Sequence, residues 1–186
     1  MNAPDYEKYR ELNSMAHKNG IVFLGGNYFS DMPICELSQT FNLNENVYNR
    51  SVSGTNIDEV GKLLDGCVFD LAPEKVFVNL GDEDIKDPQL DVDEFISKYE
   101  WILYTIHSRT NADIYIISVL SSSPKAKEIN SRLKKLARNI GCSYIDVTRA
   151  LTCEKRHLVI FDILKIHLLL NPISFSEAMN NVCVEY

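Results

Sequence analysis

The chain has 186 residues, of which 45% are hydrophobic and 24% are charged, and its formal net charge is -7. This length is sufficient for one well-buried core, so we expect a single domain over residues 1–186. The acidic balance argues against a nucleic-acid-binding surface, which needs clustered lysines and arginines, and no nucleic-acid partner is expected.

The cysteines and the N-terminal residues bear on the cellular location. The five cysteines are widely spaced and form no C-x-x-C pair, which indicates neither a disulfide framework nor a zinc site. Residues 1–19 carry charges throughout, unlike a signal peptide. No apolar run reaches the roughly 18 to 20 residues that a membrane span needs. These observations favour a cytoplasmic protein without a membrane span.

Strand and helix patterns alternate along the chain. Apolar spacing predicts an N-terminal helix at about residues 5–17, a helix from about Pro33 with the proline in its first turn, and helices around residues 57–64, 92–106 and 129–140. Short apolar runs predict strands at residues 21–24, 47–49, 75–80, 114–119 and 144–147. Gly141 is expected to end the helix before the last strand. The stretch at residues 158–170 is ambiguous, and a last helix is expected to open at Asn171 and Pro172, with Phe175, Met179 and Val182 facing inward.

This order of elements indicates the fold class. Five short apolar strands separated by helices predict a five-stranded parallel sheet covered on both faces, and right-handed crossovers make it a three-layer α/β/α sandwich. Ligands bind such sheets at the carboxyl ends of the strands, where loops at residues 25–27, 51–55 and 81–84 follow the first three strands. The sequence has no P-loop, nucleophile elbow or H-E-x-x-H pair, so neither a cofactor nor a metal is expected.

The same loops carry a family resemblance. The segments IVFLGGNYFSD (21–31), VYNRSVSGTNIDEV (47–60) and VFVNLGDEDI (76–85) resemble, in order, three signature blocks of the SGNH (GDSL-type) hydrolases. The later ISVLSSSP, YIDV and NPISFSEAMNNV resemble the branch similar to platelet-activating-factor acetylhydrolases. The resemblance implies a flavodoxin-like α/β/α fold and an esterase or acylhydrolase activity, lipase-like and directed at small acyl esters or acylated sugars.

The residues at the family's catalytic positions differ from its pattern. Asn27 occupies the position of the nucleophilic serine, and Gly26 the preceding acidic position. Gly54 matches the oxyanion-hole glycine, whereas Glu83 replaces an asparagine donor. An amide cannot attack as an alkoxide does, and an ionised carboxylate offers acceptors where an oxyanion needs donors.

The family's last block, which carries its D-x-x-H, is altered as well. Aligning Asn171 and Phe175 with the family's N-x-x-G-Y places Ile166 at the aspartate position and Leu169 at the histidine position. Loss of a triad serine or histidine alone costs on the order of a millionfold in turnover. We therefore expect a non-catalytic domain that binds a small ligand in the inherited cleft or acts as a scaffold. The expected pocket residues are Gly25, Gly26, Asn27, Ser53, Gly54, Asp82, Glu83 and Asp84.

Two alternative functions remain open. A repositioned esterase would use His167 with Asp162, and the hydroxyls considered as substitute nucleophiles, each more typical of a helix cap, are those of Ser30, Ser53 and Thr55. A cation or amine site would use Asp82, Glu83 and Asp84, with Asp31 on the neighbouring loop. The remaining histidines, His17, His107 and His157, are expected at the surface or in packing. The apolar run at residues 158–170 is a candidate homodimer interface.

Overall fold

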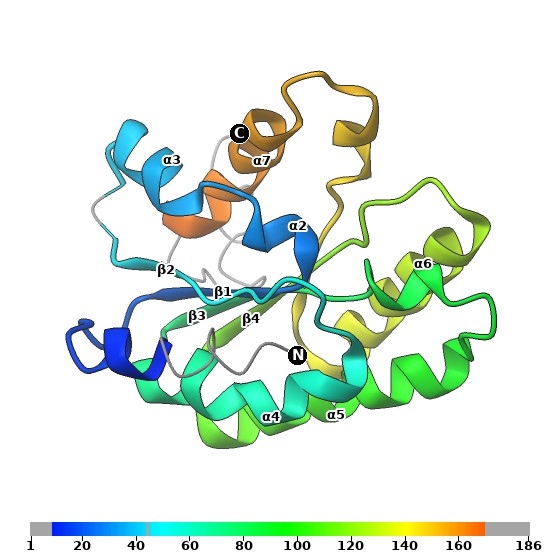
Figure 1. Cartoon of the computed structure of the whole chain (residues 1–186), viewed down its shortest axis with the longest axis horizontal. Coiled ribbons are helices and arrows are strands. Elements are labelled where there is room, and N and C mark those ends of the chain that lie inside the picture. The colour runs from blue at the N-terminus through cyan, green and yellow to red at the C-terminus, as the bar shows by residue number, and fades with distance from the viewer. Residues whose placement is uncertain (1–8, 44, 170–186) are drawn as a thin grey trace, which may run out of the picture.

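The computed structural model describes residues 9–43 and 45–169 of the chain. Its centre is a five-stranded parallel sheet with the strand order β2-β1-β3-β4-β5 (Figure 1). The strands are β1 (Ile21–Gly25), β2 (Val47–Asn49), β3 (Lys75–Asn79), β4 (Asp113–Ile117) and β5 (Ser143–Ile145). The predicted three-layer fold with a five-stranded parallel sheet is confirmed.

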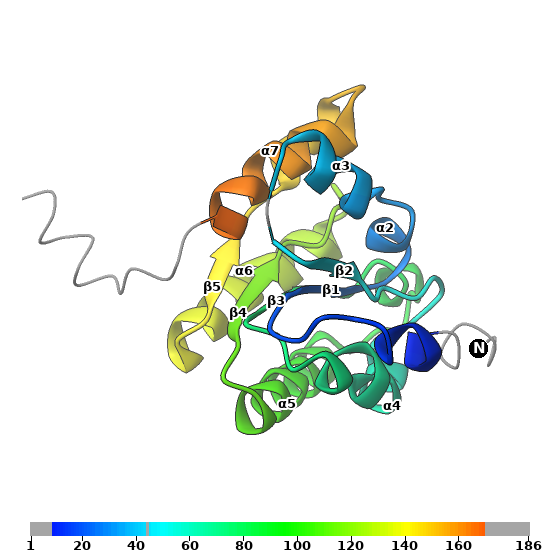
Figure 2. The same ribbon diagram turned by 90° about the vertical axis from the view of Figure 1, so that its left-hand side faces the viewer.

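Helices cover both faces of this sheet (Figures 1 and 2). The α-helices are α2 (Asn27–Ser30), α3 (Ile34–Thr40), α4 (Ile57–Cys67), α5 (Val92–Arg109), α6 (Pro124–Ile140) and α7 (Arg156–Leu169). Short 3-10 helices are η1 (Phe69–Leu71), η2 (Asp84–Lys86) and η3 (Thr148–Thr152). Helices α4, α5 and α6 lie on one face, and α2, α3 and α7 on the other. No helix among the described residues is both long enough and apolar enough to cross a membrane.

The alternation of side chains along the strands divides the core in two. Val22 and Leu24 of β1 pack toward α4, α5 and α6, whereas Ile21 and Phe23 pack toward α3 and α7. All five residues of β1 are buried because both faces are covered, which explains a continuous apolar run in place of an alternating one.

Local capping signals set the helix ends, and the predicted end at Gly141 is confirmed. Asp91 caps α5, because its Oδ1 accepts hydrogen bonds from the backbone N–H groups of Asp93 and Glu94. Helix α6 starts at Pro124 behind the Ser123 cap and ends at Gly141, whose positive φ of 77° is the left-handed conformation of a helix C-cap.

Several predicted elements differ from the structure or extend beyond its described part. The strands predicted at residues 114–119 and 144–147 are β4 and β5, which end at Ile117 and Ile145, and the helix predicted at 129–140 begins at Pro124. Pro33 is the N-cap of α3 and does not lie in its first turn. Residues 9–13 are helical, whereas the start of the predicted N-terminal helix lies outside the described residues. The ambiguous stretch forms most of α7. The predicted last helix, with Asn171, Pro172, Phe175, Met179 and Val182, also lies outside the described residues.

Candidate functional site at the carboxyl edge of the sheet

The three loops predicted to form a site meet on the side chain of Asn27. Asn27 is the first residue of α2, directly after β1 and the Gly26 turn. Its Oδ1 accepts hydrogen bonds from the Gly54 backbone N–H at 2.6 Å and from Ser53 Oγ at 2.8 Å. Its Nδ2 donates to Glu83 Oε2 at 2.6 Å. The structure therefore brings together the residues that the sequence places at the nucleophile and oxyanion positions.

Two glycines allow this convergence. Gly54 has a φ of +77°, a conformation that residues with a side chain rarely adopt, and its N–H is the group that donates to Asn27. At Gly25, a Cβ atom would lie 2.8 Å from the carbonyl oxygen of Asn79 in the neighbouring β3. Because Gly25 lacks this atom, the end of β1 can lie close against β3. This close approach fixes the position of Asn27.

Glu83 is a charged acceptor at a position where the family has a neutral donor. Hydrogen bonds from Lys86 and, to a lesser extent, from Asn27 hold the pKa of the Glu83 carboxyl below its usual value. Lys86 Nζ is also its ion-pair partner. An ionised Glu83 therefore orients the Asn27 amide, and it repels any negative charge that develops beside it.

Asp82 lies beside the Gly26 turn. Asp82 Oδ2 accepts a hydrogen bond from the backbone N–H of Tyr28 at 2.9 Å, and it lies 3.5 Å from where a Cβ at position 26 would be. Burial raises the pKa of the Asp82 carboxyl above its ordinary value. Its Oδ1 is buried and has no hydrogen-bond partner among the described residues. A carboxylate from the third loop thus supports the first turn of α2.

Asp84 connects the same loop to α4. Its Oδ1 accepts a hydrogen bond from the backbone N–H of Ile57 at 2.9 Å, beside the Asn56 N-cap. Burial raises the pKa of the Asp84 carboxyl. Asp82, Glu83 and Asp84 therefore have three different partners.

The predicted convergence of these carboxylates with Asp31 is not found. Asp31 is exposed at the C-terminal end of α2 and lines a different cleft, which it shares with the start of α7. In the two described ranges, 9–43 and 45–169, no group of three or more His, Cys, Asp or Glu residues could hold a metal ion.

His167, the expected alternative catalytic histidine, lies far from Asn27. Helix α7 begins beside Tyr28, whose ring centroid is 5.4 Å from that of His157. His167 lies ten residues further along this helix, or about 15 Å at about 1.5 Å per residue. Its ring packs against Tyr115 with the centroids 5.6 Å apart, and burial followed by the charge of Lys75 lowers its pKa. Lys75, the first residue of β3, donates to the backbone oxygen of His167, so His167 lies toward the opposite edge of the sheet from Asn27. The structure therefore does not bring His167 to Asn27.

The other residues assigned from the last block, Asp162, Ile166 and Leu169, also lie on α7. Asp162 is exposed and pairs with Lys165 at 2.6 Å. Ile166 is 56% exposed in the final turns of α7, and Leu169 is the last residue of that helix. The end of α7 cannot supply the aspartate and histidine positions, because the helix runs away from Asn27.

Another acidic residue and another histidine lie closer to α2. Glu154 and His157 have the three-residue spacing of the family's D-x-x-H, and both line the cleft that contains Tyr28. His157 was expected at the surface or in packing, and its ring packs against that of Tyr28.

The hydroxyls considered as nucleophiles have other partners. Ser30 Oγ donates to the Asn27 backbone oxygen, and Ser53 Oγ donates to the Asn27 side chain. Thr55 Oγ1 is buried without a hydrogen-bond partner among the described residues. None of the three forms a hydrogen bond with a histidine within the described ranges. The other two histidines, His17 and His107, are exposed as expected.

Comparisons with known proteins agree with this architecture. No protein-family model and no curated protein matches the sequence. A Streptococcus pneumonia protein described as a platelet activating factor superposes with a TM-score of 0.76 at 21% identity, over 89% of this chain and 91% of that one. A GDSL-like lipase from Bacteroides thetaiotaomicron superposes with a TM-score of 0.73 at 14% identity, over 88% of this chain and 96% of that one. The acetylxylan esterase Axe2 from Geobacillus stearothermophilus superposes with a TM-score of 0.65 at 11% identity, over 86% of this chain and 98% of that one. The chain therefore has the fold of the SGNH (GDSL-type) hydrolases.

Proposed function

We propose that this chain is a non-hydrolytic SGNH-type protein whose inherited cleft binds a ligand without cleaving an ester. The observation that supports this most directly is the hydrogen bond from the Gly54 N–H to Asn27 Oδ1 at 2.6 Å. An oxyanion hole needs a donor free to meet the charge that develops in the reaction. Here the residue at the nucleophile position uses that donor itself.

The neighbouring changes act in the same direction. Asn27 has no hydroxyl to activate, and Glu83 adds negative charge where a second donor would be needed. Loss of the serine or histidine of a hydrolase triad lowers turnover on the order of a millionfold, or roughly 8 kcal/mol at about 1.4 kcal/mol per decade. The remaining groups do not offset a loss of this size.

A second candidate is an esterase with a displaced nucleophile. It is favoured by the position of His157, which packs against Tyr28 one residue beyond Asn27. In that case Ser53 Oγ is the candidate nucleophile, because it contacts the side chain of Asn27.

Hydrolysis of short p-nitrophenyl esters distinguishes the two candidates. We expect the wild-type protein to hydrolyse them at the buffer rate, and His157→Ala and Ser53→Ala to leave that rate unchanged. The double variant Asn27→Ser/Glu83→Asn restores a hydroxyl and removes the carboxylate, so any hydrolysis it gains should disappear when His157→Ala is added.

The control is Ser97→Ala, which removes an exposed hydroxyl that donates to the Asp93 backbone oxygen within α5. Far-UV circular dichroism of each variant verifies the fold. Wild-type turnover that His157→Ala or Ser53→Ala abolishes would refute the non-hydrolytic proposal and establish the displaced esterase.

A cytoplasmic location and a homodimer through residues 158–170 stay predictions. In that run, Ile160, Phe161, Leu164 and Leu168 are buried in the core of the described chain. Leu158 and Ile166 are 44% and 56% exposed. Only the exposed part of the run is available to a second chain.

A further inference from the structure

Arg50 is a buried cation that has no carboxylate partner among the described residues. It follows β2 and is 7% exposed, and none of the ion pairs within residues 9–43 and 45–169 includes it. Its hydrogen bonds go to uncharged groups, because Nε donates to Asn13 Oδ1 at 3.0 Å and Nη1 donates to the backbone oxygen of Asn49 at 3.2 Å. Burial lowers the pKa of the Arg50 guanidinium below its ordinary value. A buried charge is costly, so it depends on the groups that surround it.

Two tyrosine rings complete the surroundings of this guanidinium. Its Cζ lies 5.0 Å from the centroid of the Tyr9 ring and 5.3 Å from that of the Tyr48 ring, distances typical of cation–π contacts. Tyr48 belongs to β2, whereas Tyr9 and Asn13 belong to the helical residues at the start of the described chain. Two of the four groups that hold Arg50 therefore come from the N-terminal segment.

This segment is held mainly by polar contacts. We call residues 9–19 the N-terminal strap; it lies beside α4 (Figure 2), and Asn13 is the one fully buried residue within it. Asn13 Nδ2 donates to the backbone oxygen of Gly66 on α4 at 2.5 Å, and Tyr9 Oη donates to the backbone oxygen of Ser51 at 2.9 Å. Segments with few buried apolar contacts open locally at low free-energy cost. The strap is therefore expected to open while the core stays folded.

The loop after β2 carries the donors of the candidate site. The strap holds its backbone oxygen at Ser51, and the N–H of the next residue donates to the last residue of β1 at 3.0 Å. Ser53 and Gly54 follow directly, and both donate to Asn27 Oδ1. The strap therefore contacts the loop just before the groups that hold Asn27.

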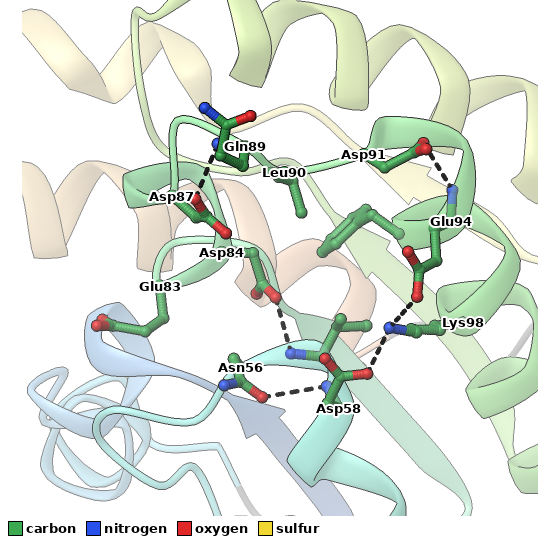
Figure 3. Close-up of a pocket in the computed structure, with 12 residues that line it drawn as sticks. Asn56, Asp58, Glu83, Asp84, Asp87, Gln89, Leu90, Asp91, Glu94 and Lys98 are labelled. Carbon is green, nitrogen blue, oxygen red and sulfur yellow. Dashed lines mark hydrogen bonds and ion pairs between the residues drawn. The ribbon is translucent and has the colours of Figure 1, made fainter.

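The other end of this loop is fixed where α4 begins. Asn56 Oδ1 accepts a hydrogen bond from the Asp58 N–H at 3.1 Å, and Asp84 Oδ1 accepts one from the Ile57 N–H at 2.9 Å, as Figure 3 shows. The loop is thus anchored to β1, to the start of α4 and to the strap, and of these three only the strap is mostly exposed. The strap is the anchor that can release the loop while the sheet stays folded.

We propose that the N-terminal strap regulates the Asn27 site, with Arg50 and Tyr9 as the residues that position the loop. While the strap is closed, the Gly54 N–H stays on Asn27 Oδ1. When the strap opens, the loop moves, and this donor becomes available to a ligand. The inference rests on the proposed function, because it concerns the same cleft and controls whether a ligand reaches the donor there.

Hydrogen exchange of the Gly54 amide, followed by NMR, tests the proposal. Asn13→Ala removes the bonds of the strap to Arg50 and to α4, and we expect it to raise the Gly54 exchange rate by about tenfold or more, because two buried hydrogen bonds are lost. Tyr9→Phe keeps the ring against Arg50 and removes only the hydroxyl, so it should raise the rate by a smaller factor. If Asn13→Ala fails to fold, Tyr9→Phe decides.

The matched control is Asn130→Ala, which also removes two side-chain hydrogen bonds, both to Val119. It should speed exchange of the core amides, which need global unfolding, and leave the Gly54 rate unchanged, because strap opening does not break its contacts. In an Asn27→Ala background the Gly54 amide has lost its acceptor, so Asn13→Ala should have little further effect there.

Three results would overturn the proposal. One is an unchanged Gly54 rate in both strap variants, and another is an equal increase in Asn130→Ala. The third is an undiminished effect of Asn13→Ala in the Asn27→Ala background, which would show that the strap acts without the Asn27 contact.

The outcome is separable from that of the ester assay, because exchange is measured on the protein without an ester present. If the wild-type protein hydrolyses esters and Asn13→Ala also raises the Gly54 rate, the proposed function fails and the regulation by the strap stands. If the protein hydrolyses no ester and the Gly54 rate does not respond, the strap proposal alone fails.

Discussion

Asp82 has two opposing effects on stability at this edge of the sheet. Its Oδ2 supports α2 through the Tyr28 N–H, while its buried Oδ1 has no partner among the described residues. Burial raises its pKa from the ordinary value of 3.8. The folded state therefore binds this proton more tightly than the unfolded state, so the contribution of Asp82 to stability falls as the pH rises through that window.

We predict that Asp82→Asn increases the free energy of unfolding at neutral pH by about 1 kcal/mol, the lower range for a buried unpaired polar group. Asparagine keeps an acceptor for Tyr28 without the buried charge. The difference between variant and wild type should grow as the pH rises from below 3.8 through the raised pKa and then become constant. Urea unfolding at a series of pH values measures it.

Asp65→Asn, at an exposed ion pair, is the control for this measurement. A stabilisation of similar size in that control would assign the effect to the lower net charge of the protein. A variant less stable than wild type at neutral pH would show that the Asp82 charge is stabilising.

At the scale of elements, α7 is held at its C-terminal end by a buried lysine. Lys75, the first residue of β3, is 6% exposed, and its Nζ donates to the backbone oxygens of His167 at 3.2 Å and Leu168 at 3.0 Å. The last carbonyl groups of a helix lack partners within the helix, and a cation there is favourable. Lys75 thus connects α7 to the sheet.

We predict that Lys75→Met destabilises the protein by about 1–3 kcal/mol, because methionine keeps most of the side-chain volume but leaves two buried carbonyls without this donor. Hydrogen exchange should show the largest loss of protection in the last turns of α7. Lys62→Met, an exposed position on α4, is the control. Unchanged protection in α7 would show that packing alone holds the helix.

The same helix shows where sequence patterns fail at this scale. Helices α5 and α6 have one regular buried stripe each, and both were predicted correctly. In α7 the buried residues Ile160, Phe161, Leu164 and Leu168 alternate with exposed Leu158 and Ile166. Apolar residues on both sides hide the helical period, because the exposed leucine and isoleucine resemble core residues in sequence.

At the scale of the whole molecule, two hydrophobic cores share one sheet. Phe23, Phe77 and Tyr115 stack across one face of the sheet, with successive ring centroids 4.8 and 4.6 Å apart. Alternate residues of the same strands enter the other core. Because each strand belongs to both cores, neither core is expected to unfold alone.

We predict a single cooperative unfolding transition in urea. The single tryptophan, Trp101, is 56% exposed on α5 and packs close to Gly61 of α4, so its fluorescence reports on one face of the sheet. Far-UV circular dichroism reports on all helices. The two midpoints should coincide. Separate transitions would contradict the expected single domain over residues 1–186.

The fold was more predictable than the site, for a physical reason. The ends of β1 and β3 are fixed by the register that pairs Gly25 with Asn79, so the meeting of Asn27, Gly54 and Glu83 followed from strand order. The histidine position depends on a connection outside the sheet. No strand register constrains it, so the spacing in the sequence alone did not fix which residue of the last block lies near Asn27.

The contact between Asn27 and Glu83 also bears on how such a sequence can change. The Asn27 amide donates a hydrogen bond of 2.6 Å to the Glu83 carboxylate, so each side chain provides a partner for the other. A serine at position 27 would offer Glu83 a hydroxyl, which has one hydrogen-bond donor where the amide has two. An asparagine at position 83 would replace the negatively charged acceptor of the Asn27 amide with a neutral one. Neither substitution reproduces a hydrolase by itself. The effects of substitutions at positions 27 and 83 are therefore expected to depend on each other.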